Sequence, residues 1–122
     1  MYGYNALGDV TSVANTRIVV ANEPRAYREA LAAALHELRP HIEVICIEPD
    51  DLARTVCAYS PRLVLCSRFT EVVERCSDAW ILLYPDRENR AVISVAGRRT
   101  VVANIEFSQL LSAIDELEPP AQ

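Results

Sequence analysis

Up to Tyr84, short runs of β-branched and aliphatic residues alternate with segments in which apolar residues recur at helical spacing. A short run that is apolar throughout is typical of a strand buried on both faces. The alternation of such strands with helices indicates a parallel sheet covered by helices on both sides. We therefore expect an α/β three-layer sandwich. The strands predicted in this part are residues 18–21, 42–47, 63–66 and 80–84.

The pattern changes after the fourth predicted strand. Only six residues, 85–90, separate it from the next apolar run at 91–96, whereas a parallel crossover needs about a dozen or more. The fifth strand is therefore expected to run antiparallel to the fourth. Gly97-Arg98 has the glycine-first form of a two-residue type II′ turn, which predicts a hairpin with a sixth strand at 100–103.

The length of 122 residues fits one compact domain. Residues 1–16 show no sustained period, which predicts a flexible N-terminal arm before a domain at 17–118 and a tail at 119–122. Four helices are predicted from apolar residues at helical spacing. The residues that mark them are Tyr27, Leu31, Ala34, Leu35 and Leu38, then Leu52, Val56 and Tyr59, then Val72, Val73 and Cys76, and finally Phe107, Leu110, Leu111, Ile114 and Leu117.

Charge and hydropathy exclude several classes of partner. With 12 basic and 17 acidic residues the formal net charge is −5, so the field of the domain repels nucleic-acid backbones and anionic lipid headgroups. We expect neither a nucleic-acid nor a membrane partner. The start of the chain lacks a basic signal-peptide segment, and no apolar run approaches the ~18 residues that span a bilayer, which predicts a cytoplasmic location. All basic residues are arginines, which excludes lysine chemistry.

The spacing of the four cysteines matches neither a redox pair of the CxxC type nor a zinc site. Small apolar side chains in a core are the favoured interpretation, so we expect buried, reduced thiols and neither a metal nor a cofactor. The four residues are Cys46, Cys57, Cys66 and Cys76.

Polar residues follow the predicted strands. Ligands of open α/β sheets bind beyond the carboxyl ends of the parallel strands, where loops and helix N-termini meet. These residues form either a polar cleft or a solvated ring of loops. They are Asn22, Glu23, Glu48, Asp50, Ser67, Arg68, Tyr84, Asp86 and Asn104. A hydrolase turn at Cys66-Ser67-Arg68 is disfavoured because it lacks the glycines of GxSxG.

Three segments resemble the receiver domain of two-component response regulators. They are Arg17-Ile-Val-Val-Ala-Asn-Glu, then Arg28-Glu-Ala-Leu, then Ser60-Pro-Arg-Leu-Val-Leu-Cys-Ser. The resemblance covers roughly residues 17–84 and, more loosely, the last helix. It implies a receiver-like, flavodoxin-like fold. With the antiparallel fifth strand expected from the short connection after Tyr84, the predicted strand order is 2-1-3-4-5-6. The hairpin within residues 85–103 stands in place of the fourth helix of a receiver.

The resemblance also implies which functional positions have changed. Receivers hold Mg²⁺ with an acidic pair after the first strand, and here Asn22 and Glu23 stand there, or Ala21 and Asn22 if Pro24 sets the register. Ser67 stands at the position of the phosphate-accepting aspartate. A serine hydroxyl without an adjacent base is neither a nucleophile nor a strong metal ligand, so phosphoryl transfer by the receiver route is not expected.

Tyr84 stands near the receiver's Ser/Thr position, and no lysine is present to fill the last conserved role. The expected function is therefore that of a degenerate receiver: a non-catalytic, phosphorylation-independent signalling or regulatory module that binds a partner protein or forms a homodimer. The alternative is a sensor of a nucleotide or an anionic metabolite. Its pocket would be lined by Asn22, Glu23, Ser67, Arg68, Tyr84 and Arg87.

Overall fold

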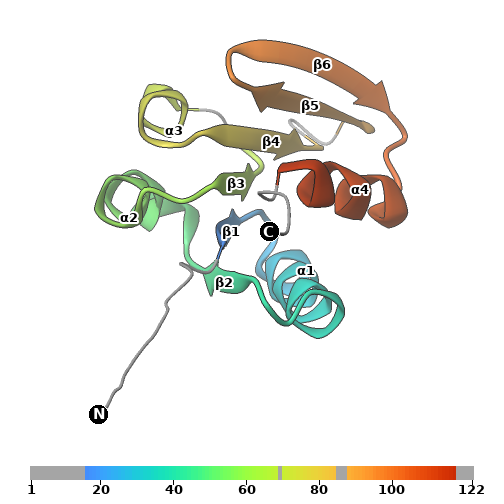
Figure 1. Ribbon diagram of the computed structural model, residues 1–122, viewed down its shortest axis with the longest axis horizontal. Coiled ribbons are helices and arrows are strands. Elements are labelled where there is room, and N and C mark those ends of the chain that lie inside the picture. The colour runs from blue at the N-terminus through green and yellow to red at the C-terminus, as the bar shows by residue number, and fades with distance from the viewer. Residues whose placement is uncertain (1–15, 69, 85–87, 118–122) are drawn as a thin grey trace, which may run out of the picture.

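A computed structural model describes residues 16–68, 70–84 and 88–117 of the chain (Figure 1). The predicted arm, except for its last residue, and the predicted tail lie outside these residues. The strands are β1 (Arg17–Ala21), β2 (Glu43–Cys46), β3 (Leu63–Cys66), β4 (Ala79–Leu83), β5 (Arg90–Val95) and β6 (Arg98–Ala103). The helices are α1 (Arg25–Leu38), the short 3₁₀ helix η1 (Pro49–Asp51), α2 (Leu52–Tyr59), α3 (Glu71–Cys76) and α4 (Phe107–Leu117).

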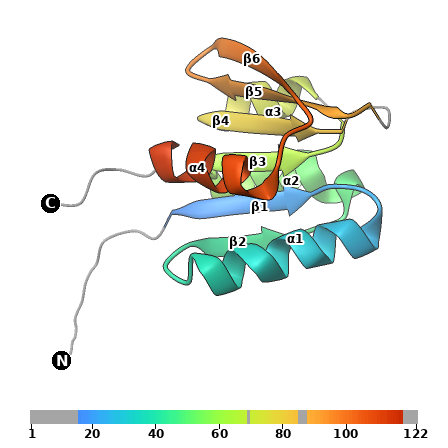
Figure 2. The ribbon, with the colours of Figure 1, turned by 90° about the vertical axis from the view of Figure 1, so that its right-hand side faces the viewer.

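The six strands form one mixed sheet in the order β2-β1-β3-β4-β5-β6. β1 pairs in parallel with β2 and β3, and β3 pairs in parallel with β4. β5 runs antiparallel to both β4 and β6. The predicted strand order and the antiparallel fifth strand are confirmed, and Figure 2 shows β4, β5 and β6 side by side.

The helices divide between the two faces of the sheet, which gives the expected three layers (Figure 1). Alternate residues of β1 show why. Ile18 and Val20 pack on the side of α1 and α4, while Val19 and Ala21 pack on the side of α2 and α3. Because residues of a strand point alternately to opposite faces, a strand that is apolar throughout supplies both cores.

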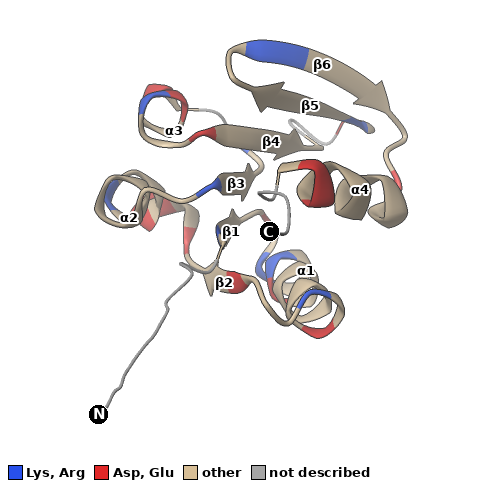
Figure 3. Ribbon diagram, in the orientation of Figure 1, with Lys and Arg blue, Asp and Glu red and all other residues tan. Residues whose placement is uncertain are grey.

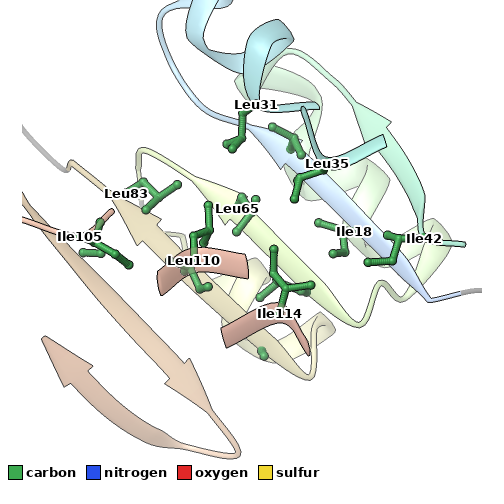
Figure 4. Close-up of a cluster of buried hydrophobic side chains, with 14 residues drawn as sticks. Ile18, Leu31, Leu35, Ile42, Leu65, Leu83, Ile105, Leu110 and Ile114 are labelled. Atoms are coloured by element: carbon green, nitrogen blue, oxygen red, sulfur yellow. The ribbon is translucent and has the colours of Figure 1, made fainter. Parts of the chain in front are cut away.

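The larger core lies between the sheet and helices α1 and α4 (Figure 4). Leu31 and Leu35 of α1 and Leu110 and Ile114 of α4 reach this core from two different helices, and Leu65 meets them from the centre of the sheet. Each of these side chains is buried. Burial of a leucine or isoleucine side chain contributes about 1.5–3 kcal/mol, so this layer is a principal source of stability.

The hairpin turn differs from the prediction by one residue. β5 ends at Val95 and β6 begins at Arg98, so the turn residues are Ala96 and Gly97 rather than Gly97 and Arg98. Both have positive φ, 52° for Ala96 and 82° for Gly97, which is the signature of a type I′ turn. The II′ prediction was wrong because Gly97 suits either turn, and the pairing of Val95 with Arg98 places Ala96 and Gly97 in the turn.

Candidate functional site

The loops that follow β1 and β3 are joined directly at the carboxyl edge of the sheet. The backbone N–H of Glu23 donates a hydrogen bond to Oγ of Ser67, with 2.8 Å between the two atoms. β1 and β3 are neighbours in register up to Ala21 and Cys66, so the residues that follow them meet here. The structure thus brings together Glu23 and Ser67, two residues of the predicted site.

Arg68 lies between two carboxylates of the same edge. Its Nε is 3.2 Å from Oε1 of Glu23, and its Nη2 is 3.9 Å from Oδ1 of Asp50. All three side chains are at least half exposed, so each ion pair contributes no more than about 1 kcal/mol. The two contacts nonetheless place the guanidinium of Arg68 between two acidic side chains.

A cavity of about 310 Å³ adjoins Arg68 on the α2 and α3 side of the sheet. Asp50 and Thr70 contribute polar groups to its wall, and Cys66 lies at the end of β3. Burial raises the pKa of the Cys66 thiol to about 12, so this thiol is protonated at neutral pH and is a poor nucleophile. The remaining lining residues are Ala21, Pro49, Leu52, Ala53 and Arg68.

Asn22 differs from its predicted place on an exposed rim. The residue is completely buried, and neither polar atom of its side-chain amide has a hydrogen-bond partner among the described residues. It lies between Ala21, the last residue of β1, and Glu23, whose carboxylate is half exposed. The environments of Asn22 and Glu23 are therefore opposite, because successive side chains along an extended chain point to opposite sides.

Arg28 is a polar residue of this region that sequence reasoning missed. Only 5% of it is exposed, and its guanidinium donates from Nη1 to the backbone oxygen of Asn22 (3.3 Å) and from Nη2 to Oε1 of Glu48 (3.4 Å). The signal was its spacing, since Arg28 precedes Leu31 and Leu35 on the buried face of α1. An arginine on such a face must find polar partners, and the ends of β1 and β2 provide them.

Tyr84 makes its contacts on the α1 and α4 side of the sheet. Its φ is 51°, which turns the chain out of the strand direction. Its hydroxyl donates to the backbone oxygen of Ile105 (3.1 Å), and its ring meets that of Tyr27 edge-on with 6.1 Å between centroids. The two tyrosines line a separate groove of about 260 Å³ between α1 and α4. Burial raises the pKa of Tyr27.

The predicted six-residue pocket is thus only partly assembled. Glu23, Ser67 and Arg68 come together, Asn22 is buried, Tyr84 contacts Tyr27 and Ile105, and Arg87 lies outside the described residues. Within the part of the chain that the structure describes, no group of three His, Cys, Asp or Glu side chains is placed to hold a metal ion.

No protein-family model, no curated protein and no solved structure matches this sequence. Among the helices of residues 16–68, 70–84 and 88–117, none combines the length and the apolar character that crossing a membrane requires.

Proposed function

We propose that this chain is a non-catalytic interaction module of receiver-like, flavodoxin-like fold that works without phosphorylation. The observation that carries the proposal is the contact between Glu23 and Ser67. At the position of a receiver's phosphate acceptor, the Ser67 hydroxyl accepts a hydrogen bond from the Glu23 amide. Arg68 pairs with the Glu23 carboxylate at the place where a receiver would bind a metal ion. Internal polar contacts therefore take the place of the reactive groups.

The proposed partner is a second copy of the chain, bound through the edge strand β6. Two backbone hydrogen bonds fix the hydrogen-bonding pattern of the hairpin. The N–H of Tyr84 donates to the oxygen of Arg90 (2.9 Å), and the N–H of Asn104 donates to the oxygen of Asn89 (2.9 Å). Hydrogen-bonded and non-bonded pairs alternate in an antiparallel ladder, so Arg90 bonds toward β4 and its partner Ala103 is in a non-bonded pair.

It follows that Arg99, Val101 and Ala103 direct their N–H and C=O groups away from β5, toward the open edge of the sheet. Such a row of main-chain groups can add a strand from another molecule. Val101 is 64% exposed, the highest value among the large exposed hydrophobic side chains of the described residues. β6 therefore offers both main-chain groups and an apolar side chain.

Charge favours antiparallel pairing of two β6 strands. The hairpin strands carry arginines and no acidic residue, as Figure 3 shows, and Arg98 and Arg99 lie at the start of β6. In a parallel pair the arginines of both copies would meet. In an antiparallel pair related by a two-fold axis they lie at opposite ends, near Glu106 of the other copy. The strand is thus complementary to itself.

The absence of phosphorylation is tested by incubating the protein with acetyl phosphate and Mg²⁺ and measuring its intact mass. We expect no gain of a phosphoryl group. A gain that disappears in the Ser67→Ala variant would make Ser67 an acceptor and overturn the proposal. A receiver with an intact acceptor aspartate, treated in the same tube, shows that the reagent is active.

Self-association is tested by light scattering over a range of concentrations. We expect a dimer that Val101→Lys converts to a monomer, because a lysine on an open edge opposes pairing. Val101→Thr keeps the strand preference and the open edge, so it should remain dimeric. A wild-type monomer at every concentration, or a dimer unaffected by Val101→Lys, would contradict the proposal. Both variants are first compared with wild type by urea unfolding.

The cavity beside Arg68 supports a second candidate, a small anionic ligand. Its volume of about 310 Å³ is within the usual range for small-molecule sites, and Arg68 and Thr70 offer donors on its wall. Asp50 on the same wall opposes an anion. Thermal denaturation with adenosine monophosphate and with inorganic phosphate tests this candidate. A stabilisation by either that is lost in Arg68→Met would favour it, and unchanged melting curves would count against it.

A further inference from the structure

Two cysteines meet between helices α2 and α3, away from the rim. Cys57 lies in α2 and Cys76 is the last residue of α3, and their sulfur atoms are 3.0 Å apart. The sequence prediction of four buried thiols was therefore wrong for most of them. Cys66 is buried, whereas Cys46 and Cys57 are exposed and Cys76 is partly buried.

We propose that Cys57 and Cys76 are a modification site at which a low-molecular-weight disulfide, of the oxidised glutathione class, forms an intramolecular disulfide bond. The inference rests on the fold and not on the proposed function. A sulfur–sulfur bond is about 2.0 Å long, so the two atoms need to approach by about 1 Å. Exposure of Cys57 admits the reagent, and the partner thiol is already in place.

The packing of α2 and α3 explains why these two thiols are held together. Both helices cover the same face of the sheet, where Val56 of α2 and Val73 of α3 belong to one buried cluster. Cys57 directly follows Val56, and Cys76 lies one helical turn beyond Val73, so each sulfur sits beside the helix–helix contact. Cys57 and Cys76 are 19 positions apart in the sequence, and the segment between them includes β3 and the Ser67-Arg68 loop.

The reaction is a pair of thiol–disulfide exchanges. The Cys57 thiolate attacks one sulfur of oxidised glutathione, a mixed disulfide forms, and one glutathione leaves as its thiolate. The Cys76 thiolate then attacks the sulfur of Cys57, so the second glutathione leaves and the Cys57–Cys76 bond forms. In sum, two protein thiols and one glutathione disulfide give one protein disulfide and two reduced glutathiones. Two hydrogen atoms pass from the protein to glutathione.

The groups around Cys57 determine how fast it should react with oxidised glutathione. Hydrogen bonding to Cys76 and, to a lesser degree, burial raise the pKa of Cys57, while Arg75 acts in the opposite direction. The attacking species is the thiolate, so the first exchange should be slow at neutral pH and should accelerate as the pH rises. Once the mixed disulfide exists, the proximity of Cys76 makes the second exchange fast.

Cys46 provides a matched reference within the same chain. It is exposed at the end of β2, and the structure gives its sulfur no sulfur neighbour among the described residues. It should therefore stop at the mixed disulfide. The pair and the reference are distinguished by mass, since closing a bridge removes two hydrogen atoms whereas the mixed disulfide adds one glutathione.

The experiment is incubation of the folded protein in glutathione redox buffers, followed by alkylation, intact-mass measurement and peptide mapping. We expect a bridge between Cys57 and Cys76, reversed by dithiothreitol, and a mixed disulfide at Cys46. In Cys76→Ser we expect Cys57 to accumulate the mixed disulfide, as Cys46 does. A stable mixed disulfide at Cys57 in the wild-type protein, with Cys76 still open to alkylation, would overturn the proposal.

A second measurement covers the case in which the bridge forms only by distorting the fold. Closing a loop of this length should raise the melting temperature of the oxidised protein by roughly 5–15 °C. A lower melting temperature on oxidation would mean that the pair is not preformed, and it too would overturn the proposal. Neither readout depends on dimerisation or on acetyl phosphate, so the test is independent of the proposed function.

Discussion

Arg39 and Asp115 form a two-point ion pair, in which Nε and Nη2 of the arginine each lie 2.7 Å from a different carboxylate oxygen. Arg39 caps the end of α1, and Asp115 belongs to α4, so the pair joins the two helices that cover one face of the sheet. Its planar, bidentate geometry makes it one of the stronger kinds of surface ion pair.

This pair predicts an acid-dependent contribution to stability. The hydrogen bond from Arg39 holds the pKa of Asp115 below its ordinary value of 3.8. The contribution is therefore complete above the unfolded pKa and disappears as the pH falls through the lower folded pKa. Because both side chains are partly exposed, Asp115→Asn should lower the free energy of unfolding by at most ~1 kcal/mol at pH 7.

Urea unfolding of wild type and Asp115→Asn at several pH values measures this difference. The stabilities of the two proteins should converge as the pH falls below the folded pKa of Asp115, where the carboxyl group is protonated in both states of the wild-type protein. A difference that is independent of pH would show that Asp115 acts through packing and not through its charge.

Because the guanidinium of Arg28 is buried, we predict that Arg28 contributes much more to the free energy of unfolding than Arg25, an exposed arginine of the same helix. Arg28→Met keeps an apolar stem but leaves the Asn22 carbonyl and Glu48 without their donor, so we expect a loss of about 1–3 kcal/mol in unfolding free energy. Arg25 pairs with Glu29 on the exposed side of α1, and Arg25→Met should lower the unfolding free energy much less than Arg28→Met does. Equal losses in urea unfolding would contradict this assignment.

The bond between Glu23 and Ser67 predicts that Ser67 has a structural role. Ser67→Ala removes the acceptor for the Glu23 amide, and we expect a loss of about 1 kcal/mol in unfolding free energy. Ser67→Thr retains a hydroxyl oxygen and serves as the control. If the alanine variant were as stable as wild type while the threonine variant was not, the hydroxyl would contribute nothing to the folded state.

The hairpin turn predicts a stabilising substitution. Ala96 has a φ of 52°, a left-handed conformation that asparagine tolerates better than alanine. Ala96→Asn creates the Asn-Gly pair preferred in type I′ turns and should raise the unfolding free energy by about 0.5–1 kcal/mol. Gly97→Ala, with φ at 82° and open space around the added carbon, should lower it by about 1 kcal/mol. Thermal unfolding that ranks these variants otherwise would contradict the type I′ assignment.

The fold could be predicted from the sequence further than the site could. The six residues after Tyr84 are too few for a parallel crossover, so the length of this connection was enough to predict an antiparallel β5. The turn at Ala96 depended on the register between β5 and β6, which the position of Gly97 alone does not determine. The positive φ of Tyr84 was not predictable either, because a pattern of residue types does not contain that angle.

The cysteines and Arg28 illustrate a second limit. From the sequence, Cys57 was interpreted as a small apolar residue of the core. Its partner Cys76 is 19 positions away on another helix, and the two thiols meet only because α2 packs against α3. Arg28 had a local signal, its place among the leucines of α1, but its acceptors lie at the ends of two strands. In both cases the information lies in which elements become neighbours.

The position of α4 in the chain has a consequence for biosynthesis. All six strands precede this helix, yet Leu110 and Ile114 complete the core that contains Ile18 of the first strand. A nascent chain that has emerged only as far as the hairpin leaves that apolar face uncovered. Folding during translation therefore remains unfinished until α4 leaves the ribosome, and the partly made domain is a natural client for a chaperone.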